Sequence, residues 1–254
     1  MEMRCAVLNN YDRIADLYDE YVTAEYDIGF WLKECEGVEQ VLEITAGTGR
    51  VTLPLLRAGK RITAVDVAFR PLERLRAKVA ETGLQVETVQ ADMRELDLGR
   101  RFPLVIIPFQ SLEELTDGCD VTATLRGVRA HLSEGGRALI TLHNPAKQNE
   151  TNARVLRLVN DSTLKNGNRL LFWSARTFDS ESRIGTSYQF YEEYDVDGLL
   201  HRKRMFSPKY RVYGKEEFTL IADRAGLHIA KEWGGYDWSP LGPDSCFMIF
   251  ELRA

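Results

Sequence analysis

The chain has 254 residues, of which 44% are hydrophobic and 28% charged, values close to the averages of folded proteins. This length and composition predict a sizeable core in one large α/β domain or two small ones, and they argue against disorder. The formal net charge is −5, from 33 basic and 38 acidic residues. No overall positive field therefore draws the protein to nucleic acid.

The cysteine pattern and the absence of long apolar runs point to the cell interior. Cys5, Cys35, Cys119 and Cys246 are scattered without CxxC or Cys/His spacing, which favours reduced thiols over disulfides or a zinc site. The first residues lack the apolar segment of a signal peptide, and no apolar run approaches the roughly 20 residues of a membrane helix. We expect a cytoplasmic protein with no membrane partner and no metal.

Residues 1–37 are rich in tyrosine and aspartate. Their apolar side chains Ile14, Leu17, Tyr18 and Tyr21 recur at helical spacing, which predicts one or two helices that cap the edge of a sheet.

Apolar runs alternate with helical patterns from residue 38 to residue 145. Strands are predicted at 38–44, 61–67, 84–90, 102–109 and 137–143, with helices beginning near Val51, Pro71 and Val121. Alternation of this kind is typical of parallel strands joined by crossover helices in a doubly wound sheet.

The pattern changes after residue 145. A short helix is predicted at 153–160, antiparallel strands at 170–178, 186–196 and 199–207, a last helix at 215–226, and closing strands at 227–235 and 245–253. We therefore predict an α/β fold with a mostly parallel seven-stranded sheet. Residues 38–145 and 213–254 form its main domain, and 146–212 form an inserted antiparallel segment.

The central motif is VLEITAGTGRV at residues 41–51, where the first strand meets the first helix. Gly47 and Gly49 let the backbone approach a ligand, and the following helix offers free N–H groups. Thr52 replaces the third glycine of the dinucleotide fingerprint, which disfavours a nicotinamide cofactor, and no P-loop lysine follows. A tight turn without a ligand remains open on this motif alone.

Two acids follow the next two strands. Asp66 ends strand two and Asp92 ends strand three, at the sheet edge where ligands of open α/β sheets bind. Asp66 could accept from both hydroxyls of a ribose. Asp92 could accept from the amine of adenine while the N–H of Met93 faces a ring nitrogen. Each acid could instead be a helix cap.

These residues together resemble a known motif series. E-x-x-x-G-x-G at 43–49, Val65-Asp66 and the ADMR of 91–94 are similar to the motifs of class I S-adenosylmethionine-dependent methyltransferases. The likeness covers 38–142, and the closing residues resemble bacterial small-molecule enzymes of the sugar-amine and glycine N-methyltransferase kind. The resemblance implies a Rossmann-like fold with an N-terminal helical lid.

The cofactor implied is S-adenosylmethionine, with S-adenosylhomocysteine as product. By the resemblance, Glu43 and the glycine loop surround its methionine part, Asp66 holds the ribose, and Asp92 holds the adenine. The residues expected at the cofactor are Tyr18, Glu43, Ala46, Gly47, Gly49, Asp66, Val67, Asp92, Met93 and Phe109. The family usually has glycine where this chain has Thr45.

Two residues are candidates for a catalytic base. In the sugar N-methyltransferases that this chain resembles, a histidine occupies the position matching Glu114, so a buried Glu114 could act as a base or pair with a cationic substrate. His143, at the end of strand five, is the rival candidate. The ordinary alternatives are an exposed glutamate at a helix start and a strand-end histidine satisfied by backbone.

The acceptor is expected between the lid, the fourth-strand loop and the inserted segment, because aromatic and arginine side chains there suit a flat or carboxylated molecule. An ordinary sheet face is the alternative for each residue. The candidates are Tyr11, Gln110, Trp173, Arg176, Tyr191 and Arg211.

We therefore expect methyl transfer from S-adenosylmethionine to a nitrogen or oxygen of a small-molecule acceptor, in secondary metabolism. An RNA- or protein-modifying methyltransferase and a non-catalytic S-adenosylmethionine-binding protein are the alternatives. The basic run at 201–209 is balanced by the acidic run before it, and the motifs of base-modifying enzymes are absent, so no nucleic-acid partner is expected. A homodimer is left open.

Overall fold

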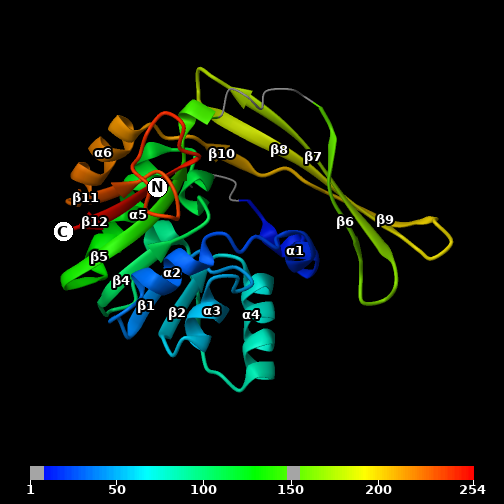
Figure 1. Cartoon of the computed structure of the whole chain (residues 1–254), viewed down its shortest axis with the longest axis horizontal. Helices are drawn as coiled ribbons and strands as arrows, with labels where there is room; N and C mark the ends of the chain where they lie inside the picture. The colour runs from blue at the N-terminus through cyan, green and yellow to red at the C-terminus, as the bar shows by residue number, and fades with distance from the viewer. Residues whose placement is uncertain (1–8, 148–154) are drawn as a thin grey trace, which may run out of the picture.

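The computed structural model describes residues 9–147 and 155–254. Its main element is a seven-stranded sheet of order β11-β12-β5-β4-β1-β2-β3, in which only β12 runs antiparallel to its neighbours (Figure 1). The strands are β1 (Gln40–Ile44), β2 (Arg61–Asp66), β3 (Glu87–Gln90), β4 (Phe102–Ile107), β5 (Leu132–His143), β11 (His228–Trp233) and β12 (Phe247–Arg253). The predicted mostly parallel seven-stranded sheet is confirmed.

Helices cover both faces of this sheet, because the central strands are apolar on both sides. On one face Leu42 packs with the α5 and α6 side chains Leu125 and Phe218. On the other, Val41 packs with apolar side chains of α2, α3 and α4 such as Leu55. The helices are α2 (Ile28–Glu34), α3 (Thr52–Arg57), α4 (Phe69–Thr82), α5 (Gly118–Ala130) and α6 (Lys215–Arg224).

The chain leaves β1 and β4 toward opposite sides of the sheet, since β2 lies next to β1 on one side and β5 lies next to β4 on the other. The strand order therefore switches between β1 and β4. Ligands of such folds bind beyond the carboxyl ends of the strands at this point.

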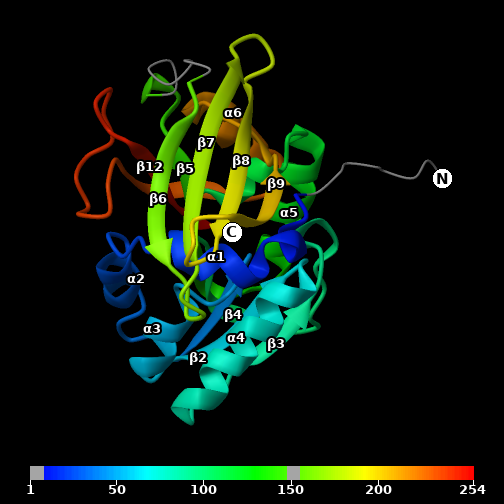
Figure 2. The same cartoon turned by 90° about the vertical axis from the view of Figure 1, so that its right-hand side faces the viewer.

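The inserted segment forms a second, antiparallel sheet, and Figure 2 shows β6 to β9 side by side with α1 below them. Its strands are β6 (Arg157–Thr163), β7 (Arg169–Asp179), β8 (Ile184–Tyr194), β9 (Leu200–Phe206) and β10 (Lys209–Arg211). The helix predicted at 153–160 is wrong. Residues 157–160 belong to β6 because long-range pairing with β7 outweighs their local helical pattern, and 153–154 lie outside the described residues.

The N-terminal segment forms a short 3₁₀ helix (Tyr11–Arg13), α1 (Ala15–Tyr21) and α2. Ile14 and Leu17 pack against apolar side chains of the antiparallel sheet, whereas Asp19 forms an ion pair of 2.9 Å with Lys78 of α4. The segment thus joins α4 to the antiparallel sheet and covers the carboxyl edge of the main sheet. Residues 1–8 of the predicted cap lie outside the described part of the chain. In that part, no helix is both long and apolar enough to cross a membrane.

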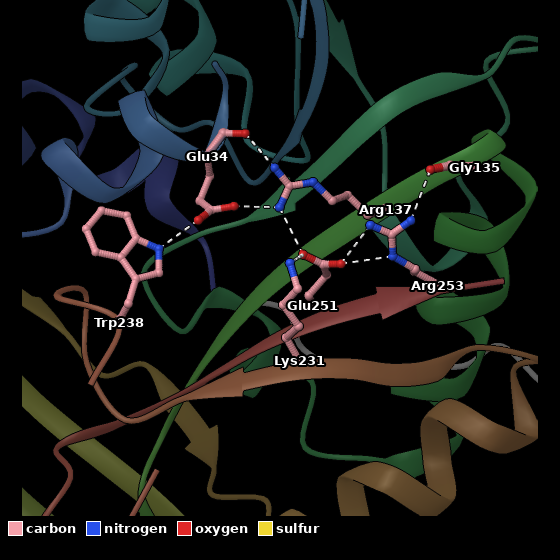
Figure 3. A network of polar contacts seen from close by, with 7 residues as sticks. All are labelled: Glu34, Gly135, Arg137, Lys231, Trp238, Glu251 and Arg253. Carbon is pink, nitrogen blue, oxygen red and sulfur yellow. Dashed lines mark hydrogen bonds and ion pairs between the residues drawn. The ribbon is translucent and has the colours of Figure 1, made fainter. Parts of the chain in front are cut away.

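Strands β5 and β12 hold a network of charges away from the carboxyl ends of the parallel strands (Figure 3). Glu251 of β12 is fully buried, and its carboxylate contacts Arg137 at 3.1 Å, Arg253 at 2.9 Å and Lys231 at 3.4 Å. Arg137 also pairs with Glu34 of α2 at 2.5 Å. This network fastens α2 to the two adjacent strands β5 and β12.

Replacing Arg137 with methionine is expected to lower the free energy of unfolding by about 3 kcal/mol, because it leaves a buried carboxylate with fewer partners. Burial raises the pKa of Glu251, but the charges of Arg137, Arg253 and Lys231 outweigh the effect of burial, and the net pKa is lowered. The wild-type network therefore stabilises the fold above the unfolded-state pKa of glutamate, and this is lost as the pH falls through the lowered value.

Urea unfolding at pH 7 measures this effect. Arg61→Met is the matched control, since Arg61 forms an exposed ion pair with Glu39 at the start of a neighbouring strand and such pairs contribute little. Equal stability of the two variants would show that the network does not stabilise the fold.

Candidate active site

A cavity of about 620 Å³ lies at the carboxyl ends of the main-sheet strands, within the range of small-molecule sites. Loops after β1 to β5 form one side of it. The N-terminal segment and the antiparallel sheet form the other, with Tyr18, Arg176 and Gln189 among the lining residues. One continuous cavity therefore joins the glycine loop to the inserted segment.

The glycine loop takes a left-handed backbone at three positions, with φ of 65° at Thr45, 57° at Gly47 and 89° at Gly49. A Cβ on Gly49 would lie 2.3 Å from Leu75 of α4, so glycine there permits close helix packing. Thr45 lines the cavity. Its left-handed conformation is unfavourable for a β-branched residue.

Asp66 lies in the centre of the cavity wall. One carboxylate oxygen accepts from the N–H of Gly47 and the other from the N–H of Ala68, both at 2.8 Å. Burial raises the pKa of Asp66, although these backbone bonds oppose the rise. The carboxylate is held in one orientation, and each oxygen keeps a lone pair for a ligand.

Asp92 is both a helix cap and a cavity residue. Its carboxylate caps the 3₁₀ helix Met93–Glu95 through the N–H of Arg94 and also accepts from the Arg94 guanidinium at 2.6–3.0 Å. Burial raises the pKa of Asp92, but the bonds from Arg94 outweigh this, and the net pKa is lowered. A charged acceptor therefore stands beside Met93 in the cavity.

Glu114 is held by the N-terminal segment. The hydroxyl of Tyr11 donates to one carboxylate oxygen at 2.7 Å, and the side-chain amide of Asn9 donates to the other at 3.0 Å. Burial raises the pKa of Glu114 to about 7, although both hydrogen bonds lower it. A carboxylate with this environment can hold a cation in the cavity.

The neighbouring acid, Glu113, is paired with His143. Glu113 is 1% exposed, and its two oxygens contact the backbone N–H of His143 at 2.8 Å and the ring Nδ1 at 2.5 Å. Both residues line the cavity. Sequence reasoning missed Glu113, and the only available signal was a second glutamate directly before Glu114.

Phe109 and Gln110 lie in the loop after β4, at the switch in strand order. Both have positive φ, 57° and 58°, and such outliers cluster at functional sites. Gln110 donates to the hydroxyl of Tyr236 at 3.1 Å. The guanidinium of Arg50 lies 4.3 Å from the ring centre of Phe109. The loop is thereby fixed from two sides.

Twelve of the predicted site residues line the cavity. They are Tyr11, Tyr18, Gly47, Asp66, Val67, Asp92, Met93, Phe109, Gln110, Glu114, His143 and Arg176. The remaining six are not among its lining residues and are Glu43, Ala46, Gly49, Trp173, Tyr191 and Arg211.

Glu43 and Ala46 are buried in the core beneath the loop. Glu43 accepts from the Thr52 hydroxyl at 2.7 Å, and burial raises its pKa to about 8. The same bond gives Thr52 a structural role in place of the third glycine.

Trp173, Tyr191 and Arg211 lie in the inserted segment, in β7, β8 and β10. Trp173 donates to Glu192. It lies three residues before Arg176 on the same strand, and because successive strand residues face opposite sides, the two side chains are on opposite faces of the sheet. Tyr191 is stacked on Phe172 in the core under α1, and Arg211 pairs with Glu217 of α6 at 2.7 Å.

Within residues 9–147 and 155–254, no group of three or more His, Cys, Asp or Glu side chains is placed to hold a metal ion.

Comparison with known proteins finds similar sequences and similar solved structures. Residues 41–136 match a family model described as a methyltransferase domain. The cypemycin N-terminal methyltransferase of a Streptomyces species is 32% identical over 107 residues, which are 42% of this chain and 43% of that protein. The matched region thus spans less than half of that relative's length.

Solved structures resemble nearly the whole chain. The CcbJ methyltransferase from Streptomyces caelestis has a TM-score of 0.80 and 25% identity, with 96% of both chains covered. The sugar N-methyltransferase KedS8 from a Streptoalloteichus species has a TM-score of 0.77 with 98% of this chain and 96% of that chain covered, and its 16% identity indicates a shared fold alone. Residues 41–136 therefore match a methyltransferase domain, and nearly the whole chain has the fold of these solved methyltransferase structures.

Proposed function

We propose that this protein transfers a methyl group from S-adenosylmethionine to a small-molecule acceptor, and that the acceptor atom is an amine nitrogen. The observation that carries the proposal is one continuous cavity whose lining includes Asp66, Asp92 and Glu114. An oxygen acceptor is the alternative within the same reaction class.

The cavity residues fit the cofactor. The oriented carboxylate of Asp66 suits a pair of ribose hydroxyls, and a Cβ added at Gly47 would come within 4.0 Å of that carboxylate. Asp92 and Met93 suit the edge of an adenine. Tyr18 also lines the cavity, and its hydroxyl makes no hydrogen bond within the described part of the chain.

The protein's contribution to the reaction is alignment in a closed cavity. When bound, S-adenosylmethionine supplies an activated methyl group on a sulfonium. Glu114 attracts a cationic amine, and the N-terminal segment that holds Glu114 also lines the cavity through Tyr11 and Tyr18. Alignment of this kind can supply roughly 7–11 kcal/mol of a reaction barrier.

The proposed domain division follows these roles. Residues 38–145 and 213–254 hold the cofactor, residues 1–37 close over it, and residues 146–212 supply the acceptor side of the cavity through Arg176.

Release of S-adenosylhomocysteine tests the function. We expect release with members of a panel of amino sugars, amino acids and small phenols, with amines preferred, and no release when Asp66 is replaced with alanine. Methyl incorporation into bulk RNA or protein with none into the panel would contradict the small-molecule proposal.

A further inference from the structure

Glu113 and His143 form a hydrogen-bonded pair in the cavity, and the proposed function gives this pair no role. Glu113 follows β4 and His143 ends β5, two adjacent strands that bring the residues together across 30 positions of sequence. Two contacts from one buried carboxylate, to the backbone and to the ring, fix the position and the rotation of the imidazole. The ring is also flanked by Tyr210 and Phe247, with ring centres at 6.4 and 6.3 Å.

We propose that Glu113 is a positioning residue that holds His143 with its Nε2 available to the acceptor, and that His143 removes the proton from the acceptor nitrogen. This inference rests on the proposed methyl transfer and names the residue that prepares the amine for it.

The hydrogen bond decides which ring nitrogen is free. Ionised Glu113 can only accept, so with Glu113 in this form the Nδ1 that contacts it carries the proton, and Nε2 then carries the lone pair. The side chain of His143 is 35% exposed and lines the cavity. Within residues 9–147 and 155–254, no hydrogen bond or ion pair engages Nε2. A carboxylate behind Nδ1 also stabilises the imidazolium that forms when Nε2 takes a proton.

Glu114 is less suited to the same step. Both of its oxygens already accept hydrogen bonds, from Tyr11 and Asn9, which hold its carboxyl group against the N-terminal segment. In its ionised form this carboxylate serves instead to hold the ammonium form of the acceptor. The two adjacent glutamates therefore have different roles, one in binding and one in orienting the base.

The reaction balances as follows. The ammonium proton passes to Nε2 of His143, and the freed nitrogen lone pair forms the new N–C bond while the S–C bond of S-adenosylmethionine breaks. The electron pair of that bond stays on sulfur, which gives neutral S-adenosylhomocysteine and a methylated ammonium. His143 returns its proton to water when product leaves.

The ring tautomer can be measured without knowing the acceptor. Nitrogen NMR of protein labelled with ¹⁵N-histidine observes all four histidines, and the His143→Gln variant identifies the signal of His143. We expect neutral His143 to be protonated at Nδ1 and unprotonated at Nε2 in the wild type, and to show a mixture of tautomers in Glu113→Gln. A wild-type His143 protonated at Nε2 would overturn the proposal, whether or not the variants fold.

Turnover gives the second readout, with the best acceptor of the panel. His143→Gln is expected to lower kcat about 100- to 10,000-fold, and Glu113→Gln to lower it by a smaller factor, while affinity for S-adenosylhomocysteine stays unchanged in both. Added imidazole should restore part of the activity of His143→Ala but none of that of Glu114→Gln.

The matched control is Glu95→Gln, an exposed glutamate on a short helix outside the cavity, which should leave kcat unchanged. Wild-type kcat in His143→Gln would overturn the base assignment. Failure of the wild type to bind S-adenosylhomocysteine would instead contradict the proposed function, and the tautomer measurement separates the two results.

Discussion

Replacing Asp66 with alanine is expected to weaken binding of S-adenosylhomocysteine by about 3 kcal/mol, roughly 100-fold, because hydrogen bonds to a charged acceptor contribute about 1.5–3 kcal/mol each. The carboxylate is fixed by the N–H groups of Gly47 and Ala68, so a ligand meets it already oriented. Asp66→Asn keeps one acceptor oxygen but no charge, and we expect an intermediate affinity. Isothermal titration calorimetry measures both variants.

The control for this prediction is Asp97→Ala. Asp97 likewise accepts from a backbone N–H, that of Gly99 at 3.0 Å, but in an exposed turn. Thermal unfolding without ligand checks that each variant is folded. Unchanged affinity in a folded Asp66→Ala protein would show that the adenosyl group does not bind at this carboxylate.

Replacing Glu114 with glutamine is expected to lower kcat/KM roughly 100- to 1,000-fold, with affinity for S-adenosylhomocysteine unchanged. This factor corresponds to a loss of about 3–4 kcal/mol of transition-state stabilisation. Removing one partner of a buried, hydrogen-bonded charge pair has a cost of this size. Glutamine is nearly the same shape and keeps an oxygen for the Tyr11 hydroxyl. The loss should therefore fall on the cationic acceptor, and steady-state kinetics with the acceptor from the panel measure it.

Folding stability separates this effect from damage to the fold. Because burial raises the pKa of Glu114 to about 7, the folded state holds a proton more tightly than the unfolded state. Glu114 therefore adds to the free energy of unfolding at low pH. This contribution is lost as the pH rises from the ordinary pKa of glutamate through about 7. Glu114→Gln should thus be at least as stable as the wild type at pH 8, and a clear loss of stability there would contradict the assigned burial.

The main sheet and the cavity residues at the ends of β1 to β3 could be predicted because their signals are local in sequence. The glycine loop, Asp66 and Asp92 each follow a strand directly, and parallel strands bring their carboxyl ends to one edge without further information. The carboxylate of Asp92 caps a helix and also lines the cavity, so the cap does not exclude the proposed contact with a ligand.

The acceptor side could not be predicted to the same degree because it depends on strand phase and on long-range pairing. Arg176 and Trp173 are three residues apart on β7, and only the side chain of Arg176 lines the cavity. Residues 157–160 are in a strand because β7 is beside them. Sequence periodicity indicates that a strand alternates but not which face meets a cavity.

The roles of the two glutamates show the same limit. Composition and spacing indicate acids after β4, whereas the partners that distinguish them, Tyr11 for Glu114 and His143 for Glu113, lie 103 and 30 residues away. Their different chemistry arises only when the N-terminal segment and β5 have packed in place.

A crystal structure with S-adenosylhomocysteine bound tests the central claim most directly. The account predicts its ribose hydroxyls on the carboxylate of Asp66, its adenine beside Asp92 and Met93, and its sulfur facing the part of the cavity that contains Glu114 and His143. An adenosyl group bound elsewhere in the structure would contradict it. So would crystals soaked in millimolar S-adenosylhomocysteine that contain no adenosyl group.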